Sequence, residues 1–282
     1  MPRNKAALEQ FRTKMLPAWR HTLLVGATEP KMEMTWNADL QIKGSRSAML
    51  ELNRPDETGH LTAIYFASGP MNEDAKASRS KVAVLAHPNG DSVYCDDSGQ
   101  PTGLAKKLLD RGCAVVIIKK FSTGVPENEF ANFYTTYNRT QVQRNARDLL
   151  TVCSEAREVA STKSGRAQVV LCGAGRAGLW SLLASPTAVD AVVADCDQAE
   201  VTEDQNLLAP DLFCPGIQNI GAFEGAAIFA APHPFLVHNA AQDFPIRKLR
   251  AVYEVCAATK NLRIERSRLE DEALAEWIMG LK

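Results

Sequence analysis

The segment that decides the fold spans residues 169–180 and reads Val169-Val170-Leu171-Cys172-Gly173-Ala174-Gly175-Arg176-Ala177-Gly178-Leu179-Trp180. Its first four residues form an apolar run of strand length, and β-branched valines favour an extended chain. Three glycines then permit a tight turn. The segment therefore predicts a buried strand, a glycine turn and a helix in direct succession.

The same two elements alternate along most of the chain. We predict helices at residues 5–24, 102–111, 140–160, 175–184, 246–258 and 270–281. We predict strands at residues 48–52, 61–67, 81–86, 113–118, 168–172, 189–194, 234–237 and 262–264. From residue 81 onward this alternation implies an α/β fold, with a mostly parallel sheet covered by helices on both faces. The first two strands follow each other closely, so we expect them to pair antiparallel at one edge, and residues 71–80 to form a polar loop.

Composition limits the classes of protein and of partner. The chain has 282 residues, 45% of them hydrophobic, and a net charge of −1. This balance argues against a nucleic-acid or membrane partner, since neither a basic field nor an apolar run of membrane-spanning length occurs. The seven cysteines are scattered without a CxxC pair, so we expect no metal site, no cofactor and no disulfide framework.

We divide the chain into an N-terminal helix and lead-in at residues 1–44 and one domain at residues 45–282. The first residues form an amphipathic stretch rather than an apolar signal core, which predicts a cytoplasmic protein if the chain is complete. A removed leader or a longer parent protein would leave the localisation open.

The glycine turn at residues 173–178 has three readings. A strand, a tight turn and a helix form the nucleophile elbow, in which a strained turn lifts a Ser, Cys or Asp above the sheet. The residue at the tip here is Gly175, which has no side chain. The same residues also fit the dinucleotide pattern G-x-G-x-x-G, with Asp195 as the ribose-binding acid. The third reading is a packing turn whose small residues let helix and strand approach closely. Several strands precede the turn, a position that favours the elbow.

Other segments carry a resemblance to a known family. Lys81-Val82-Ala83-Val84-Leu85-Ala86-His87-Pro88-Asn89-Gly90 resembles the strand and oxyanion loop of α/β-hydrolases. Residues 133–140 and 147–151 resemble acetylxylan-esterase and dienelactone-hydrolase relatives in large bacterial hydrolase proteins. Residues 173–178 match their elbow, and Pro234-Phe235-Leu236-Val237-His238-Asn239 matches their penultimate core strand. The resemblance covers residues 45–282, and the helix with Trp19 is similar to segments that lead into the second half of tandem hydrolase proteins.

The resemblance implies a catalytic order of nucleophile, acid and histidine that this chain does not keep. The nucleophile position is Gly175, and the acid position holds Gln242, with Asp243 one residue late. The late histidine is expected near Ser267-Arg268-Leu269-Glu270, where none occurs. The family's oxyanion donors map onto the N–H of Arg176 and an amide of the turn at Asn89 and Gly90.

Several other residues remain candidates for the site. His238, near Asp243, is the best remaining acid or base, although a structural histidine is an open alternative. His87 could contribute its side chain to the oxyanion loop or bond the local backbone. Asp195 and Asp197 could bind a ligand hydroxyl or cap the following segment.

Two residues near the turn are expected to pack rather than react, since Cys172 is expected in the core and Ser181 in helix packing. Tyr134, Tyr137, Asn138 and Arg139 form a polar-aromatic cluster suited to a sugar, a partner or loop docking.

These residues predict an α/β-hydrolase scaffold without ordinary hydrolase chemistry. The first hypothesis is a non-catalytic homologue that binds an acylated carbohydrate or another small acyl ligand, or supports a tandem or adjacent active hydrolase domain. The alternatives are an esterase that uses an unusual nucleophile or a water activated by His238, and a nucleotide-binding protein that uses the glycine turn.

Overall fold

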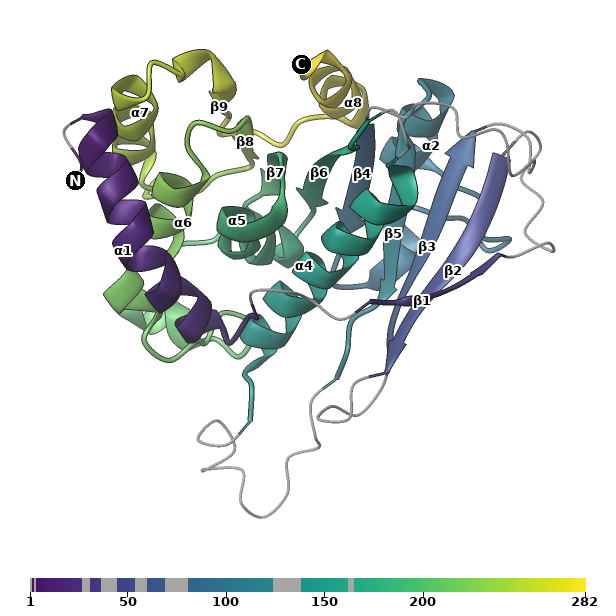
Figure 1. Cartoon of the computed structure of the whole chain (residues 1–282), viewed down its shortest axis with the longest axis horizontal. Coiled ribbons are helices and arrows are strands. Elements are labelled where there is room, and N and C mark those ends of the chain that lie inside the picture. The colour runs from purple at the N-terminus through teal and green to yellow at the C-terminus, as the bar shows by residue number, and fades with distance from the viewer. Residues whose placement is uncertain are drawn as a thin grey trace.

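A computed structural model describes residues 2, 4–26, 31–36, 45–53, 60–68, 81–123, 138–161 and 165–282 (Figure 1). Its centre is a nine-stranded sheet in the order β1-β2-β3-β5-β4-β6-β7-β8-β9. The strands are β1 Glu33–Trp36, β2 Ser45–Asn53, β3 His60–Ser68, β4 Lys81–Ala86, β5 Ala114–Lys120, β6 Gln168–Gly173, β7 Ala191–Asp195, β8 Phe235–His238 and β9 Leu262–Ile264.

The sheet is parallel over the six strands from β5 to β9 in spatial order and antiparallel at its other edge. Strand β6 lies between β4 and β7 and is parallel to both, as predicted for the strand that leads into the glycine turn. The expected antiparallel pairing of the two early strands is also confirmed, since β2 pairs with β3 in this way. Strand β3 in turn pairs antiparallel with β5. The sequence pattern missed β1, which extends this antiparallel edge.

Helices cover both faces of the sheet, as the alternation predicts. They are α1 Lys5–Leu23, α2 Gly103–Asp110, α4 Gln141–Ala160, α5 Arg176–Ala188, α6 Ala222–Ala230, α7 Ile246–Val255 and α8 Asp271–Gly280. Short 3-10 helices are η1 Gly90–Val93, η3 Asp204–Leu208, η4 Ile217–Ile220 and η5 Thr259–Asn261.

Side chains of the central strands alternate between two hydrophobic clusters. In β6, Val169 and Leu171 join the cluster formed with α1, α4, α5, α6 and α7, whereas Val170 and Cys172 join the cluster formed with α2 and α8. Successive residues of a strand point to opposite faces, so a strand buried on both sides must be apolar at every position. This is why β6 reads as a continuous apolar run. The face toward α2 and α8 is the one that carries the site described below.

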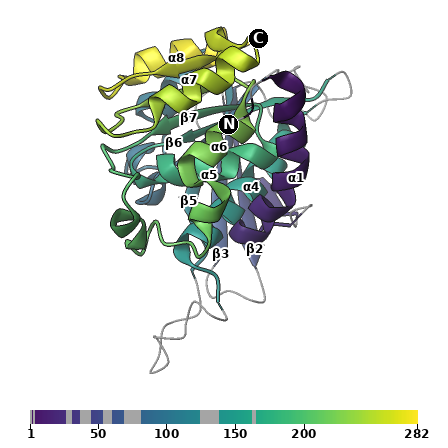
Figure 2. The ribbon, with the colours of Figure 1, turned by 90° about the vertical axis from the view of Figure 1, so that its left-hand side faces the viewer.

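Helix α1 packs against α5 and α6, within the hydrophobic cluster that also includes α4 and α7 (Figure 2). Trp19 is fully buried and its ring centroid lies 5.1 Å from that of Phe229 in α6. Its indole N–H donates to the carbonyl of Leu183 in α5 at 3.1 Å. Residues before position 45 thus contribute to the main core, while the division of the chain at residue 44 stays a prediction.

Some expectations need correction or lie outside the described residues. Helix α7 ends at Val255, three residues before the predicted end, and α6 was not predicted. The turn at 54–59 and the loop at 71–80 lie outside the described residues. Among the helices that are described, none has the length and apolar character needed to cross a membrane.

Candidate functional site

The glycine turn has the geometry expected of an elbow. Strand β6 ends at Gly173, α5 begins at Arg176, and Gly175 between them has φ +57° and ψ −144°. Residues with a Cβ rarely adopt this positive φ, whereas glycine adopts it without a steric penalty. The turn is also closely packed, because a Cβ added at Gly178 would lie 1.8 Å from the carbonyl oxygen of Asp195. The elbow and packing readings thus describe the same segment.

A cavity of about 130 Å³ lies beside the turn, at the carboxyl ends of the parallel strands. Binding sites of open α/β sheets are found at this edge. The lining residues are Val93, Tyr94, Leu104, Cys172, Gly173, Ala174, Val193, Asp195, His238, Arg268, Leu269, Asp271 and Leu274. We call this space the elbow cavity.

His87 occupies the position next to the missing nucleophile. An added Cβ on Gly175 would lie 3.3 Å from Nε2 of His87. The backbone N–H of Asn89 donates to Nδ1 of His87 at 3.0 Å. Nδ1 is therefore an acceptor, and Nε2 carries the proton in the neutral imidazole. Burial lowers the pKa of His87, and the charge of Arg268 lowers it further, while Asp195 and Asp197 oppose the shift.

His238 has the same tautomer for the same reason. It ends β8 directly beside Asp195 at the end of β7, and it is only 3% exposed. The N–H of Leu269 donates to its Nδ1 at 3.2 Å, so Nε2 carries the proton. Burial lowers the pKa of His238, the positive charge of Arg268 adds to this effect, and Asp195 opposes it. His238 is thus a neutral hydrogen-bond donor rather than a base at Nε2.

Asp195 is a buried carboxylate with most of its capacity already used. It is 2% exposed. Its Oδ1 accepts from the N–H of Asp197 at 2.8 Å and from Nδ2 of Asn239 at 2.7 Å. Its Oδ2 lies 3.6 Å from Nε of Arg268. The capping role considered for Asp195 is therefore present in its contact with Asp197.

Arg268 is a residue of the elbow cavity that sequence reasoning did not single out. It lies in the segment where the resemblance places the late histidine, and it supplies a guanidinium there. A guanidinium stays charged at any physiological pH and cannot accept a proton. The signal was visible in the sequence as Ser267-Arg268-Leu269-Glu270, but only the fold brings it to Asp195.

Asp243, which the sequence places near His238, makes its hydrogen bond with another residue. Asp243 is exposed, and one of its carboxylate oxygens accepts from the hydroxyl of Thr202. Register explains the difference, because the ends of β7 and β8 lie side by side whereas Asp243 follows in the loop after β8. The histidine therefore has Asp195 as its neighbouring acid.

The turn after β4 uses its amides internally. The N–H of Gly90 donates to the carbonyl of His87 at 3.0 Å, and the N–H of Asn89 is held by the His87 ring. The expected oxyanion donors at Asn89 and Gly90 are thus engaged. Arg176 begins α5, where first-turn amides have no partner within the helix. Its guanidinium lies 3.1 Å from Asp211 and 3.9 Å from Asp197.

Two further side chains near the turn are inert. Cys172 is 3% exposed and burial raises the pKa of its thiol well above the usual value, so it stays protonated. Ser181 is fully buried and donates to the carbonyl of Ala177 at 2.8 Å, in agreement with a packing role.

The remaining candidates give less information. Tyr134 and Tyr137 lie outside the described residues, and Asn138 and Arg139, just before α4, have interactions of their own. Tyr94, which the sequence did not single out, lines the elbow cavity and donates to the carbonyl of Ala86 at 3.3 Å. Within the described part of the chain, no three His, Cys, Asp or Glu side chains are grouped so as to hold a metal ion.

The elbow cavity thus combines hydrogen-bond donors with paired charges. One imidazole N–H comes from His238, which lines the cavity, whereas His87 lies next to Gly175 and is not a lining residue. The charge of Arg268 is offset by Asp195, and Asp271 adds a second carboxylate to the lining. This set can accommodate a polar neutral group better than an additional anion, because the carboxylate of Asp271 would repel an anion.

Comparisons with solved structures identify the scaffold. "Methylesterase BT1017" superposes with a TM-score of 0.62 at 13% identity, covering 99% of this chain and 65% of its own. Acetyl Xylan Esterase 1 from Thermoanaerobacterium sp. has a TM-score of 0.53 at 14% identity, covering 99% of this chain and 94% of its own. A promiscuous CE15 esterase from a marine bacterial metagenome has a TM-score of 0.59 at 14% identity, with coverages of 96% and 91%.

These similarities show the fold, and identities this low show nothing finer. The chain has the α/β-hydrolase fold, as its sequence predicted. It spans about two thirds, 65%, of the methylesterase chain. No family model matches the sequence, and no curated protein matches it either.

Proposed function

We propose that this protein is a non-catalytic α/β-hydrolase-fold protein that binds a neutral acyl group in the elbow cavity. The observation that carries the proposal is the pairing of Gly175 at the elbow with a protonated Nε2 of His87 beside it. A nucleophilic mechanism needs a side chain at the tip and a base with a free lone pair within reach. Here the tip has no side chain, and the neighbouring nitrogen is a donor.

The second support is the charge at the position of the late histidine. Arg268 pairs with Asp195 as a permanent cation, so it balances the buried carboxylate without taking part in proton transfer. A buried carboxylate without a partner would be costly, which gives Arg268 a structural reason to be there. The buried carboxylate of Asp195 therefore stays paired with a cation that cannot take up or release a proton during binding.

The ligand class follows from the donors and the size of the cavity. An acyl carbonyl oxygen can accept from the imidazole N–H of His238, and its methyl group can lie against Leu104, Val193 or Leu274. A cavity near 150 Å³ holds a molecule as small as benzene, so about 130 Å³ suits an acetyl-sized group. We propose an acylated carbohydrate as the parent ligand, with an active tandem or adjacent hydrolase domain as the source of turnover.

The test compares binding with turnover. Peracetylated methyl xyloside is titrated into the protein by calorimetry, with methyl xyloside as the ligand control and sodium acetate as the anionic control. We expect the acetylated sugar to bind more tightly than both. His238→Asn keeps an acceptor for the N–H of Leu269 but removes the Nε2 donor, and should weaken binding about fivefold. Equal binding of the three compounds would contradict the proposal.

A second candidate function is an esterase that uses water activated by His238, and the adjacent carboxylate of Asp195 is the observation in its favour. It requires the opposite tautomer, which would set Nδ1–H against the N–H of Leu269. Hydrolysis of p-nitrophenyl acetate separates the two functions. We expect no more than background turnover, whereas robust turnover that His238→Ala abolishes would establish the esterase.

A further inference from the structure

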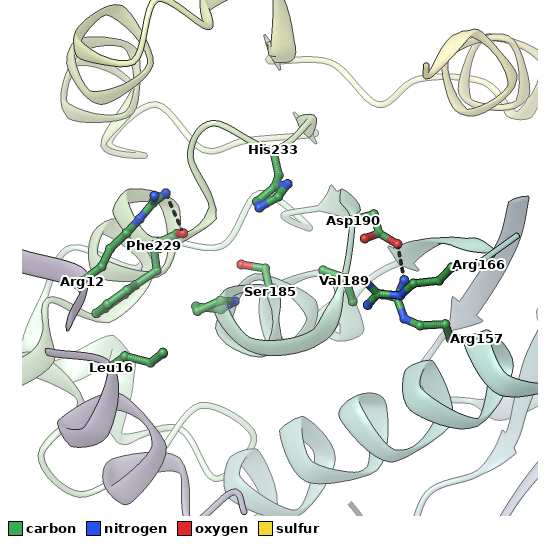
Figure 3. A pocket seen from close by; sticks show the side chains of 10 residues that line it. Arg12, Leu16, Arg157, Arg166, Ser185, Val189, Asp190, Phe229 and His233 are labelled. Atoms are coloured by element: carbon green, nitrogen blue, oxygen red, sulfur yellow. Dashed lines mark hydrogen bonds and ion pairs between the residues drawn. The ribbon is translucent and has the colours of Figure 1, made fainter. Parts of the chain in front are cut away.

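A second and larger cavity lies at the opposite ends of the parallel strands from the elbow cavity. Its volume is about 330 Å³, and we call it the arginine groove after Arg12, Arg157 and Arg166 in its wall (Figure 3). Arg166 precedes β6 and Asp190 precedes β7, so the groove is at the amino ends of the parallel strands. The elbow cavity is at their carboxyl ends, and the two sites share no lining residue.

The charges of the groove leave an excess of cations. Asp190 is the carboxylate in its lining, and Oδ2 of this residue accepts from Arg157 at 2.6 Å and from the N–H of Val169 at 2.7 Å. Its charge is therefore neutralised within the wall. Arg166 is exposed at the rim, and no ion pair involves it within the described residues.

Arg12 supplies a buried donor on the other wall. It donates from Nη2 to the carbonyl of Phe229 at 3.1 Å, and its Nη1 lies 2.8 Å from the exposed Glu9. Its Nε is buried and has no hydrogen-bond partner among the described groups. Because this Nε is inaccessible to solvent, a ligand in the groove would interact with the positive charge of the Arg12 guanidinium rather than with Nε itself.

Apolar side chains complete the same wall. Leu16 and Phe229 both line the groove, and the ring of Phe229 is held by Phe11 and Trp19 at centroid distances of 5.6 and 5.1 Å. In Figure 3 Arg12, Leu16 and Phe229 stand opposite Asp190, Arg157 and Arg166. The groove therefore offers an apolar surface on one side and guanidinium groups on both.

We propose that the arginine groove binds a small organic anion with an apolar body, its carboxylate or phosphate group between the arginines and its apolar part against Phe229 and Leu16. Guanidinium groups form charge-assisted hydrogen bonds with both kinds of anion, which makes them the shared chemistry of the ligand. This site is independent of the function proposed for the elbow cavity.

The test uses benzoate, phenyl phosphate and the neutral analogue benzyl alcohol, titrated into the full chain at low salt. We expect at least one anion to bind about tenfold more tightly than benzyl alcohol, and the two anions identify whether carboxylate or phosphate is preferred. Arg166→Gln should weaken that binding about fivefold, and Arg166→Glu should weaken it further. Arg166 is exposed, so both variants should keep the wild-type melting temperature.

Two control variants locate the binding. Arg250→Gln removes an equal charge from an exposed position of α7 outside the groove and should leave affinity unchanged. His238→Asn alters the elbow cavity and should also leave it unchanged. Anions that bind no better than benzyl alcohol, Arg166 variants with wild-type affinity, or a loss of affinity in His238→Asn would each overturn the proposal.

Discussion

Gly175 determines at the scale of one residue what the elbow can do. Its φ of +57° strains any residue with a Cβ, and an added Cβ would lie 3.3 Å from Nε2 of His87. We expect Gly175→Ser to lower stability by about 1–3 kcal/mol, measured by urea unfolding. We also expect no esterase activity, because Nε2 of His87 already carries a proton and cannot accept one from serine.

Gly165→Ser is the matched control for this change. Its added Cβ meets no atom within 4 Å and its φ is not in the left-handed region, so stability should be almost unchanged. Esterase activity in Gly175→Ser alone would show that a base exists which the hydrogen bonds of the two histidines do not reveal.

His238 makes stability depend on pH. Burial lowers its pKa below the ordinary value of 6.5, so the unfolded chain binds more protons than the folded one as the pH falls. The part of the free energy of unfolding that depends on neutral His238 is fully present above pH 6.5, and it is lost as the pH falls through the pKa of His238 in the folded state. We expect the free energy of unfolding to decrease from pH 7 toward pH 5.

His238→Asn should reduce that decrease, because asparagine accepts from Leu269 without titrating. His87 shifts in the same direction, so part of the pH dependence should remain in the variant. Chemical unfolding at several pH values measures both. An unaltered slope in the variant would mean that His238 is not the group being protonated.

At the scale of elements, the glycines of the turn bring a helix against a strand. A Cβ at Gly178 in α5 would lie 1.8 Å from the backbone oxygen of Asp195, at the end of β7. Backbone cannot move aside as a flexible side chain can, so Gly178→Ala should destabilise the protein by about 1–3 kcal/mol or more. Gly280→Ala in α8 meets no atom within 4 Å and should be neutral. Differential scanning calorimetry of the two helical variants tests this, and equal melting temperatures would remove the packing role of the turn.

At the scale of the whole molecule, α1 is expected to unfold together with the sheet. Trp19 is fully buried against α5 and α6, and Trp19→Ala should cost about 3–5 kcal/mol. Leu24→Ala, at a position that is 40% exposed, should cost little. Calorimetry should show one shifted transition in Trp19→Ala. A separate early transition with an unchanged main one would mean that α1 unfolds independently of the sheet.

The sequence was sufficient for the elements whose pattern is local. Continuous apolar runs such as residues 81–86 and 168–172 predict strands buried on both faces, and their alternation with helices predicts the parallel sheet. Strand β1 and helix α6 escaped prediction for local reasons. Strand β1 has four residues, and α6 has nine residues that are all small or apolar except Glu224, so neither shows a clear period.

The sequence by itself determined the fold class, the glycine at the elbow and the lack of a late histidine, because each is a property of one short segment. Only the tertiary structure decided which side chains of the site lie next to one another. Parallel register brings Asp195 beside His238, and the turn after β4 brings His87 to Gly175. Asp195 was not predicted as the neighbour of His238, because contacts between strand ends depend on which strands lie side by side and in which register, which spacing along the chain does not encode.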